Sequence, residues 1–430
     1  MQKQKLHWLK LDNAAKIYPA AKRKGWINFF RLSATLCEDV DPAILQSALN
    51  TVHRRFPSIL ARLRHGLFWY YLEEMASPPT IREEGPCPLI VEGKENLSKC
   101  AIRVIYYKNR IAVEYFHSIT DGTGGMIFLK SLVAEYLKQR YGAIIPYSND
   151  ILDPSDSVKK EELEDCFPKF EGRVARPRSD SRTYKLKGTK KIGKFLDLTV
   201  GTLDAGELIS ISHEYDVSVT EFLCAVMLKA LIEHQNAHVP KISRQKPVKV
   251  LIPVNLRRLY GAVTLRNFSQ YVTPGIDPRL GTYTLKELAT AVHHHMGEEV
   301  TPQKMSARIK VNTDAEKSLL ARIPPLFLKN IVMRLVYDSV GETTSCLNIS
   351  NLGLVRLPEE MEKYVDRFDF IIGPPASTPN NCSVASYKGK VYINFIRNIK
   401  EAELERLFFT TLVKLGLHVN IQSNQSEVYI

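Results

Sequence analysis

The sequence lacks the features that mark membrane proteins, secreted proteins and disulfide-stapled proteins. No apolar run approaches the ~18 residues that a membrane-spanning helix needs. The start of the chain, Met1 to Trp8, has no apolar core of the kind found in signal peptides. The seven cysteines are scattered without any C-x-x-C pair, which argues against a disulfide framework and against a thiolate zinc site. We therefore expect a cytoplasmic protein with free thiols and no membrane span.

Acidic residues are outnumbered by basic ones, and the formal net charge is +13. Such a charge suits an anionic partner, which can be nucleic acid, an anionic membrane surface or a phosphorylated cofactor. The sequence has no zinc-finger spacing, no RNA-recognition aromatic pattern and no heptad zipper. Nucleic acid is therefore not supported as a partner beyond the charge itself.

The length of 430 residues exceeds what one hydrophobic core usually holds, so two domains are expected. Strand patterns with interspersed helices predict mixed sheets covered by helices. A polar stretch over residues 147–193 contains an acidic patch at 161–165 and then a basic run. We interpret this stretch as a crossover, that is, the segment that connects one domain to the other. The predicted division is an N-terminal half over residues 1–172, a basic linker over 173–193 and a C-terminal half over 194–430.

The basic run allows two interpretations. It can be a solvated linker, or some of its arginines can attract an anionic donor substrate. The arginines in question are Arg173, Arg176, Arg178 and Arg182.

A histidine stands where a predicted strand meets a glycine-bracketed turn. Residues 101–107 and 110–116 have the composition of a β-hairpin that turns at 108–109, and His117 follows it directly. After the turn, apolar residues repeat at helical spacing until Gly142 supplies a stop signal. An imidazole held in such a turn can accept a proton from a hydroxyl or amine. Asp121 is the candidate to organise the loop, although a strand end and a helix cap would explain both residues without chemistry.

The run from His117 through Asp121 and Gly122 has the form H-x-x-x-D-G, with Gly124 and Gly125 behind it. It resembles the signature of the acyltransferase superfamily that includes chloramphenicol acetyltransferase, peptide-synthetase condensation domains, plant acyl-CoA-dependent acyltransferases and alcohol acetyltransferases. Phe116 replaces the first histidine of the H-H-x-x-x-D-G form. The resemblance implies an α/β fold of two half-domains, each a mixed sheet flanked by helices, with His117 in a channel between them.

The same resemblance assigns roles in the C-terminal half. Residues 249–258 look like the strand with V-N-x-R that supplies an arginine, so Arg257 is implied to pair with Asp121 and to make that aspartate structural. A guanidinium fork can hold a carboxylate at two points. Without the resemblance, Arg257 would be taken for a surface cation that ends a strand. Asn267, in the R-N pair that follows, is a candidate cofactor-binding residue.

Two further segments match the superfamily in part. The S-N-L-G at residues 350–353 resembles condensation and alcohol acetyltransferase relatives, which makes Ser350 a candidate to stabilise an oxyanion. Residues 369–373, Asp-Phe-Ile-Ile-Gly, resemble the D-F-G-W-G loop of the plant enzymes with the middle Gly-Trp replaced.

The remaining histidines do not predict a metal site. His293, His294 and His295 point in three directions around a predicted helix, so a solvated face is expected. His234 and His238 have the spacing of a helical ligand pair, but no carboxylate or cysteine stands at a supporting position in the sequence and Pro240 follows. We therefore expect no metal.

The resemblance implies an enzyme that moves an acyl group, with acetyl as the expected one, from acyl-CoA to a hydroxyl or amine of a small molecule. His117 is the expected general base. Acyl-CoA is a co-substrate, and no permanently bound cofactor is expected. The alternative is a free-standing condensation domain that takes its acyl group from an acyl-carrier protein. A third possibility is a protein without turnover that binds a small molecule or associates with nucleic acid through its charge.

Overall fold

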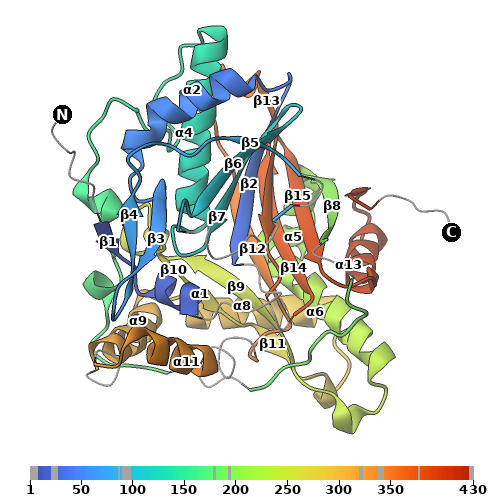
Figure 1. Cartoon of the computed structure of the whole chain (residues 1–430). Helices are drawn as coiled ribbons and strands as arrows, with labels where there is room; N and C mark the ends of the chain where they lie inside the picture. Colours follow the sequence, from blue (N-terminus) through green and yellow to red (C-terminus); the bar gives the residue numbers. More distant parts are fainter. Residues whose placement is uncertain are drawn as a thin grey trace.

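A computed structural model of the chain describes residues 8–20, 28–85, 88–89, 98–177, 181–191, 195–318, 323–336, 343–375 and 378–425. Arg178 of the basic run and Cys87, one of the seven cysteines, lie outside these residues. The described part is an α/β structure in which helices cover mixed sheets (Figure 1), as predicted from the sequence. None of its helices has both the length and the apolar content that crossing a bilayer requires.

The N-terminal half builds two sheets. Its elements are β1 (Trp8–Lys10), α1 (Ile17–Ala20), β2 (Phe29–Leu36), α2 (Pro42–Val52), β3 (Ala61–His65), β4 (Tyr70–Glu74), β5 (Arg82–Glu83), β6 (Ile102–Tyr107), β7 (Arg110–Phe116) and α4 (Gly122–Tyr141). One sheet has the order β1-β4-β3. The other has the order β13-β2-β7-β6-β5, in which β13 is Val365–Ile372 and β5 and β6 are parallel. Helices α2 and α4 pack together, and α4 lies against β2 (Figure 1).

Local signals explain where these elements begin and end. Asp41 caps α2 by accepting hydrogen bonds from the backbone N–H groups of Ala43 and Ile44. Helix α4 ends at Gly142, which adopts a left-handed φ of 66°. Strand β4 begins only at Tyr70, because the backbone N–H of Gly66 donates a hydrogen bond to the carbonyl of Trp69 and closes a turn there.

The C-terminal half builds a larger mixed sheet with the order β10-β9-β12-β14-β15-β8-β16, and β11 pairs with β9. Its strands are β8 (Asp197–Asp204), β9 (Val248–Asn255), β10 (Ser269–Val272), β11 (Gly275–Ile276), β12 (Leu347–Leu354), β13 (Val365–Ile372), β14 (Asn380–Tyr387), β15 (Lys390–Arg397) and β16 (Asn420–Ser423). Its helices are α5 (Ala205–Glu214), α6 (Val219–His238), α7 (Leu256–Tyr260), α8 (Leu285–Glu299), α9 (Pro302–Lys317), α11 (Leu326–Val336), α12 (Glu359–Glu362) and α13 (Glu403–Lys414).

Strand β13 departs from the predicted division of the chain. It lies within residues 194–430, yet it pairs antiparallel with β2 and so extends the sheet of the N-terminal half. This pairing covers an edge of β2 that would otherwise expose its backbone hydrogen-bonding groups. Residues 369–372 are part of β13, so the comparison of 369–373 with a loop was wrong for all but Gly373.

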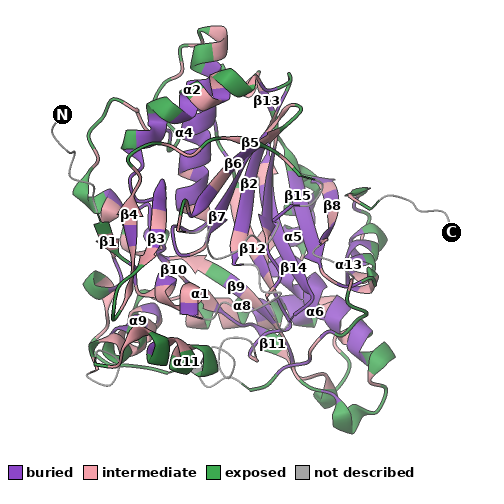
Figure 2. Cartoon of the chain, in the orientation of Figure 1, coloured by how far each residue is buried: buried purple, intermediate pink, exposed green. Residues whose placement is uncertain are grey.

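The hydrophobic side chains form two large cores. The first lies around β2, β7, α2 and α4, and β13 contributes Phe368 and Phe370 to it. The second lies around α6, β9, β14 and β15. Figure 2 shows the buried residues concentrated along the central strands and α4, with exposed residues on the outer helices. Two cores are what the length of the chain leads one to expect.

The acidic part of the crossover is docked onto the protein. Glu162 is buried, and its carboxylate accepts hydrogen bonds at 2.6 and 2.7 Å from both terminal nitrogens of Arg55. The carbonyl oxygen of Glu162 also accepts from the backbone N–H of Leu265. The crossover therefore links the N-terminal half to a segment of the C-terminal half. By contrast, Arg173, Arg176 and Arg182 of the basic run are exposed.

Candidate active site

His117 lies immediately after β7, at the start of a loop over residues 117–121 that leads into α4; we call this the His117 loop. The backbone N–H of His117 donates to the carbonyl of Asn28 at 2.9 Å, which holds the end of β7 against the residue before β2. Ser118, Thr120 and Asp121 are buried, whereas His117 is partly exposed. The loop is therefore fixed while its imidazole remains partly accessible.

One nitrogen of the imidazole is held by a chain of side chains. Nδ1 of His117 lies 3.3 Å from Oδ1 of Asn267, and Nδ2 of Asn267 donates to Oδ2 of Asp12 at 3.3 Å. Because the amide nitrogen faces Asp12, the amide oxygen faces His117, and Nδ1 must carry the proton. The lone pair then lies on Nε2. Among the described residues, no hydrogen bond uses Nε2.

The protonation states of His117 and Asp12 follow from the burial of these side chains. Burial lowers the pKa of His117 below its ordinary value of 6.5, and its hydrogen bonds and the charge of Asp121 oppose this only in part. The imidazole is therefore neutral at neutral pH. Burial also raises the pKa of Asp12 to about 6, although Arg266 opposes the shift.

Aromatic rings fix the plane of His117. The Tyr18 ring stacks on it with centroids 4.5 Å apart, and the Phe30 ring packs against it in a T-shaped arrangement with centroids 5.2 Å apart. Asp12 and Tyr18 come from the segment 8–20, in which the sequence analysis found no functional signal. Their role in placing the imidazole becomes visible only when β1 and α1 are folded against the His117 loop.

Asp121 meets Arg257 in a buried contact. NH1 of Arg257 donates to Oδ2 of Asp121 at 2.7 Å, and the same oxygen accepts from the backbone N–H of Phe268 at 2.9 Å. The carboxylate also caps α4 through Gly124. Burial favours the neutral acid, but Arg257 and these hydrogen bonds outweigh it and hold the pKa of Asp121 below its ordinary value.

The contact is a single one, and the two-point fork that the sequence suggested is not formed. NH1 also donates to Oδ1 of Asn255 at 3.4 Å. Two further nitrogens donate to the backbone, Nε to the carbonyl of Thr264 at 2.7 Å and NH2 to that of Arg266. Arg257 thereby fixes the segment 264–268 against the His117 loop. Asn267, which was expected to bind a cofactor, lies in this segment and contacts His117.

Gly124 permits the close approach of the two segments. An ideal Cβ at this position would lie 2.2 Å from Oγ1 of Thr120 and 2.3 Å from the carbonyl oxygen of Leu265.

We expect Gly124→Ala to destabilise the protein by about 3 kcal/mol, because the backbone of Leu265 cannot yield. Chemical denaturation measures this effect. Gly297→Ala on α8 is the matched control, since its Cβ meets nothing within 4 Å, and it should stabilise slightly. Equal stability of both variants would contradict the conclusion that only glycine fits at position 124.

Gly122 and Ser350 lie on neighbouring elements. Gly122 is the first residue of α4, and a Cβ there would lie 2.6 Å from Cδ2 of Leu352 on β12. Ser350 itself is paired across the sheet with Ser383. No contact described in the structure joins its hydroxyl to His117.

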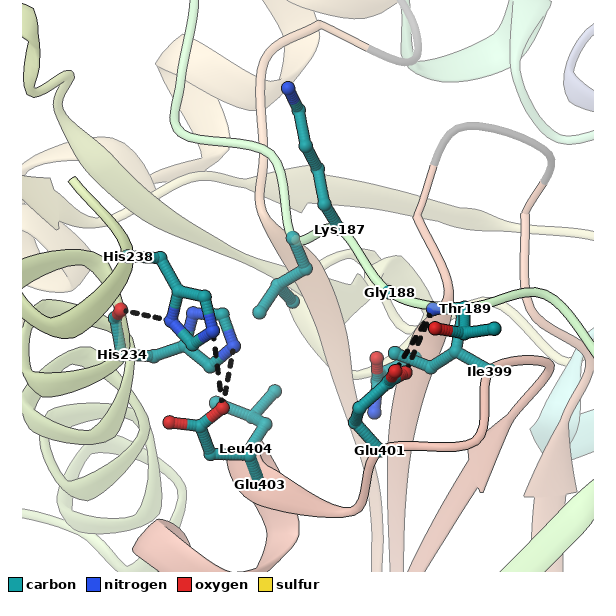
Figure 3. Close-up of a pocket in the computed structure, with 11 residues that line it drawn as sticks. Lys187, Gly188, Thr189, His234, His238, Ile399, Glu401, Glu403 and Leu404 are labelled. Atoms are coloured by element: carbon teal, nitrogen blue, oxygen red, sulfur yellow. Dashed lines mark hydrogen bonds and ion pairs between the residues drawn. The ribbon is translucent and has the colours of Figure 1, made fainter.

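One cavity among the described residues lies elsewhere. It has a volume of about 280 Å³, and its lining includes His234, His238 and Glu403 but not His117 (Figure 3). The channel to His117 that the sequence analysis expected therefore remains a prediction.

No family model matches this chain, and no curated protein matches it either. Solved structures do resemble it. The trichothecene 15-O-acetyltransferase TRI3 of Fusarium sporotrichioides has a TM-score of 0.61 and 13% identity, covering 94% of this chain and 93% of its own. TRI101 of the same organism, complexed with coenzyme A and T-2, has a TM-score of 0.62 and 10% identity, covering 97% and 100%. The first condensation domain of the CDA synthetase has a TM-score of 0.58 and 13% identity, covering 94% and 95%.

The chain has the two-lobed α/β fold of these acetyltransferases and condensation domains. The coverage spans nearly the whole chain in each case. This confirms the fold class expected from the H-x-x-x-D-G resemblance. At identities of this size the likeness concerns the fold, and activity has to be argued from the residues of the site.

Proposed function

We propose that the protein is an acyltransferase that moves an acyl group from acyl-CoA to a hydroxyl or amine of a small molecule, with His117 as general base. The observation that carries this proposal is the state of the imidazole. Its Nδ1 is bound to Asn267, its Nε2 has no partner among the described residues, and burial keeps it neutral. A base that is fixed in orientation and neutral at neutral pH suits removal of a proton from an acceptor.

In the proposed reaction, Nε2 of His117 takes the proton of the acceptor as its oxygen or nitrogen attacks the thioester carbon. The tetrahedral intermediate collapses by breaking the carbon–sulfur bond. The imidazolium then returns the proton to the sulfur, and the thiol of coenzyme A leaves. Asn267 keeps the proton on Nδ1 during this cycle, and Asp121 with Arg257 holds the loop in place. No covalent acyl-enzyme is needed.

The structural comparisons support acyl-CoA as the acyl donor. TRI101 was solved with coenzyme A, and the exposed arginines of the basic run are compatible with an anionic donor. A condensation domain shares the fold, so a carrier-protein thioester is the alternative donor.

Thiol release from acetyl-CoA, measured with a panel of alcohols and amines, tests the proposal. We expect release that depends on the acceptor and is lost in His117→Ala. Activity with an acyl-carrier thioester alone would favour the condensation function instead. Inertness with both donors would indicate a protein that binds without turnover.

The pH dependence of the rate supplies a separate prediction. As the pH falls through the pKa of His117, the imidazole gains a proton on Nε2 and can no longer act as a base. Because burial lowers that pKa, we expect the rate to stay constant from pH 8 to about 6.5 and to fall only below it. Steady-state kcat/KM across pH 5 to 8 measures this. An acid limb centred above pH 6.5 would show that the imidazole is not held in the neutral state.

A further inference from the structure

A second group of titratable side chains lines the cavity in the C-terminal half. His234 and His238 lie near the end of α6, and Glu403 is the first residue of α13. Figure 3 shows these three side chains gathered on one side of the cavity, opposite Thr189 and Glu401. The sequence analysis found no carboxylate or cysteine at a supporting position beside these two histidines. In the fold, Glu403 supplies a carboxylate from far along the chain.

The distances among these groups suit a metal ion. Oε2 of Glu403 lies 3.4 Å from Nε2 of His238 and 3.7 Å from Nε2 of His234. One ligand atom from each residue falls within 4.8 Å of the others. Zinc ligands at about 2.0–2.2 Å in a tetrahedron are roughly 3.4 Å apart. The nitrogen-to-oxygen distances therefore already approach the edges of such a tetrahedron.

Each imidazole is held in orientation by a hydrogen-bond partner at its Nδ1 nitrogen. Nδ1 of His238 donates to the carbonyl oxygen of His234 at 2.9 Å, which leaves a lone pair on Nε2. Nδ1 of His234 lies 3.0 Å from the hydroxyl of Tyr184. Such outer partners are typical of histidine ligands, because they fix the ring and its tautomer. The rings are stacked with planes 13° apart, and the half-exposed His238 has room to tilt toward a common ion.

The cavity contains an unused polar group. Asn380 lines it and is 1% exposed, yet neither its amide nitrogen nor its amide oxygen has a hydrogen-bond partner among the described residues. Buried polar groups are normally satisfied, so an unpaired amide in a cavity indicates that the cavity receives a polar ligand.

We propose that His234, His238 and Glu403 bind one Zn²⁺ ion, with the fourth coordination position open to the cavity that Asn380 lines. Two imidazoles and one carboxylate are a ligand set that zinc accepts, with a water or a small ligand in the fourth place. The ion would fasten the end of α6 to the start of α13. Binding to the folded chain alone would raise its melting temperature.

Calorimetric titration of the full chain with ZnCl₂, after removal of metals by a chelator, tests the proposal. We expect one equivalent to bind. His238→Ala and Glu403→Gln should each weaken binding by at least about 100-fold, since loss of an outer partner alone costs 10- to 100-fold. Tyr184→Phe should weaken it by about 10-fold. His294→Ala is the matched control, because this exposed histidine on α8 lies outside the cluster, and it should leave the affinity unchanged.

Titration with Co²⁺ adds a spectroscopic readout, since tetrahedral coordination gives strong visible absorption. The absorption should appear in the wild type and in His294→Ala and be absent from Glu403→Gln. Circular dichroism checks that each variant is folded. Absence of saturable binding by the folded wild type would overturn the proposal. So would equal affinities in the wild type, His238→Ala and Glu403→Gln, because the ion would then be bound by cysteines or other histidines.

Discussion

Replacement of His117 by alanine is expected to lower kcat by about 10²- to 10⁴-fold, the usual contribution of a positioned general base. The fold should survive, because the rest of the loop is held by other groups. Thr120, for example, donates from Oγ1 to the carbonyl of Leu265 at 2.6 Å. Steady-state rates of thiol release with an acceptor found in the panel measure the effect.

His213→Ala is the control for this substitution, because His213 is an exposed histidine on α5. It should retain the wild-type rate. Circular dichroism and the melting temperature show whether His117→Ala is folded. A folded His117→Ala protein with an undiminished rate would remove His117 from the chemistry.

Removal of the Asp121 carboxylate should have the largest effect on stability. Asp121→Ala leaves the guanidinium of Arg257 buried without its counter-charge, and such a change typically costs about 3–5 kcal/mol. It also removes the acceptor for the backbone N–H of Phe268 and the cap of α4. The midpoint and slope of urea unfolding measure the loss.

A pair at the surface provides the comparison. Asp277 contacts Arg279 and also accepts a hydrogen bond from the backbone N–H of Arg279. Surface ion pairs contribute little and loss of such a cap costs about 1 kcal/mol, so Asp277→Ala should lower the stability far less than Asp121→Ala. The double variant Asp121→Ala with Arg257→Leu should recover part of the stability, because the unpaired charge is gone. Equal loss in Asp121→Ala and Asp277→Ala would mean that the Asp121–Arg257 contact does not hold the two halves together.

Elements whose ends are set by local chemistry could be predicted from the sequence. The hairpin turn at 108–109 was expected, and Lys108 adopts a positive φ there. Helix α4 ends at Gly142, as its glycine signal indicated. These features depend on the conformational preferences of a few adjacent residues, which are visible in the sequence.

Features that depend on distant segments could not be predicted. Strand β13 joins the sheet of the other half because β2 has a free edge, and nothing within residues 365–372 shows this. Glu403 reaches His234 and His238 only because α13 packs on α6. Side-chain contacts of this kind are set by the packing of whole elements.

The candidate site combines both kinds of residue. The H-x-x-x-D-G motif drew attention to His117 and Asp121, and the resemblance pointed to Arg257, which the structure brings to 2.7 Å from Asp121. The chain of Asn267 and Asp12 behind the imidazole was missed, because a sequence does not show which amide faces which ring. This chain determines the tautomer and thereby which nitrogen can act as the base.

The nitrogen-15 resonances of His117, assigned by comparison with His117→Ala, test the central claim most directly. A neutral imidazole with its proton on Nδ1 and its lone pair on Nε2 is expected at pH 7, with protonation only below pH 6.5. An imidazolium at pH 7, or a proton on Nε2, would contradict the assignment of His117 as the general base.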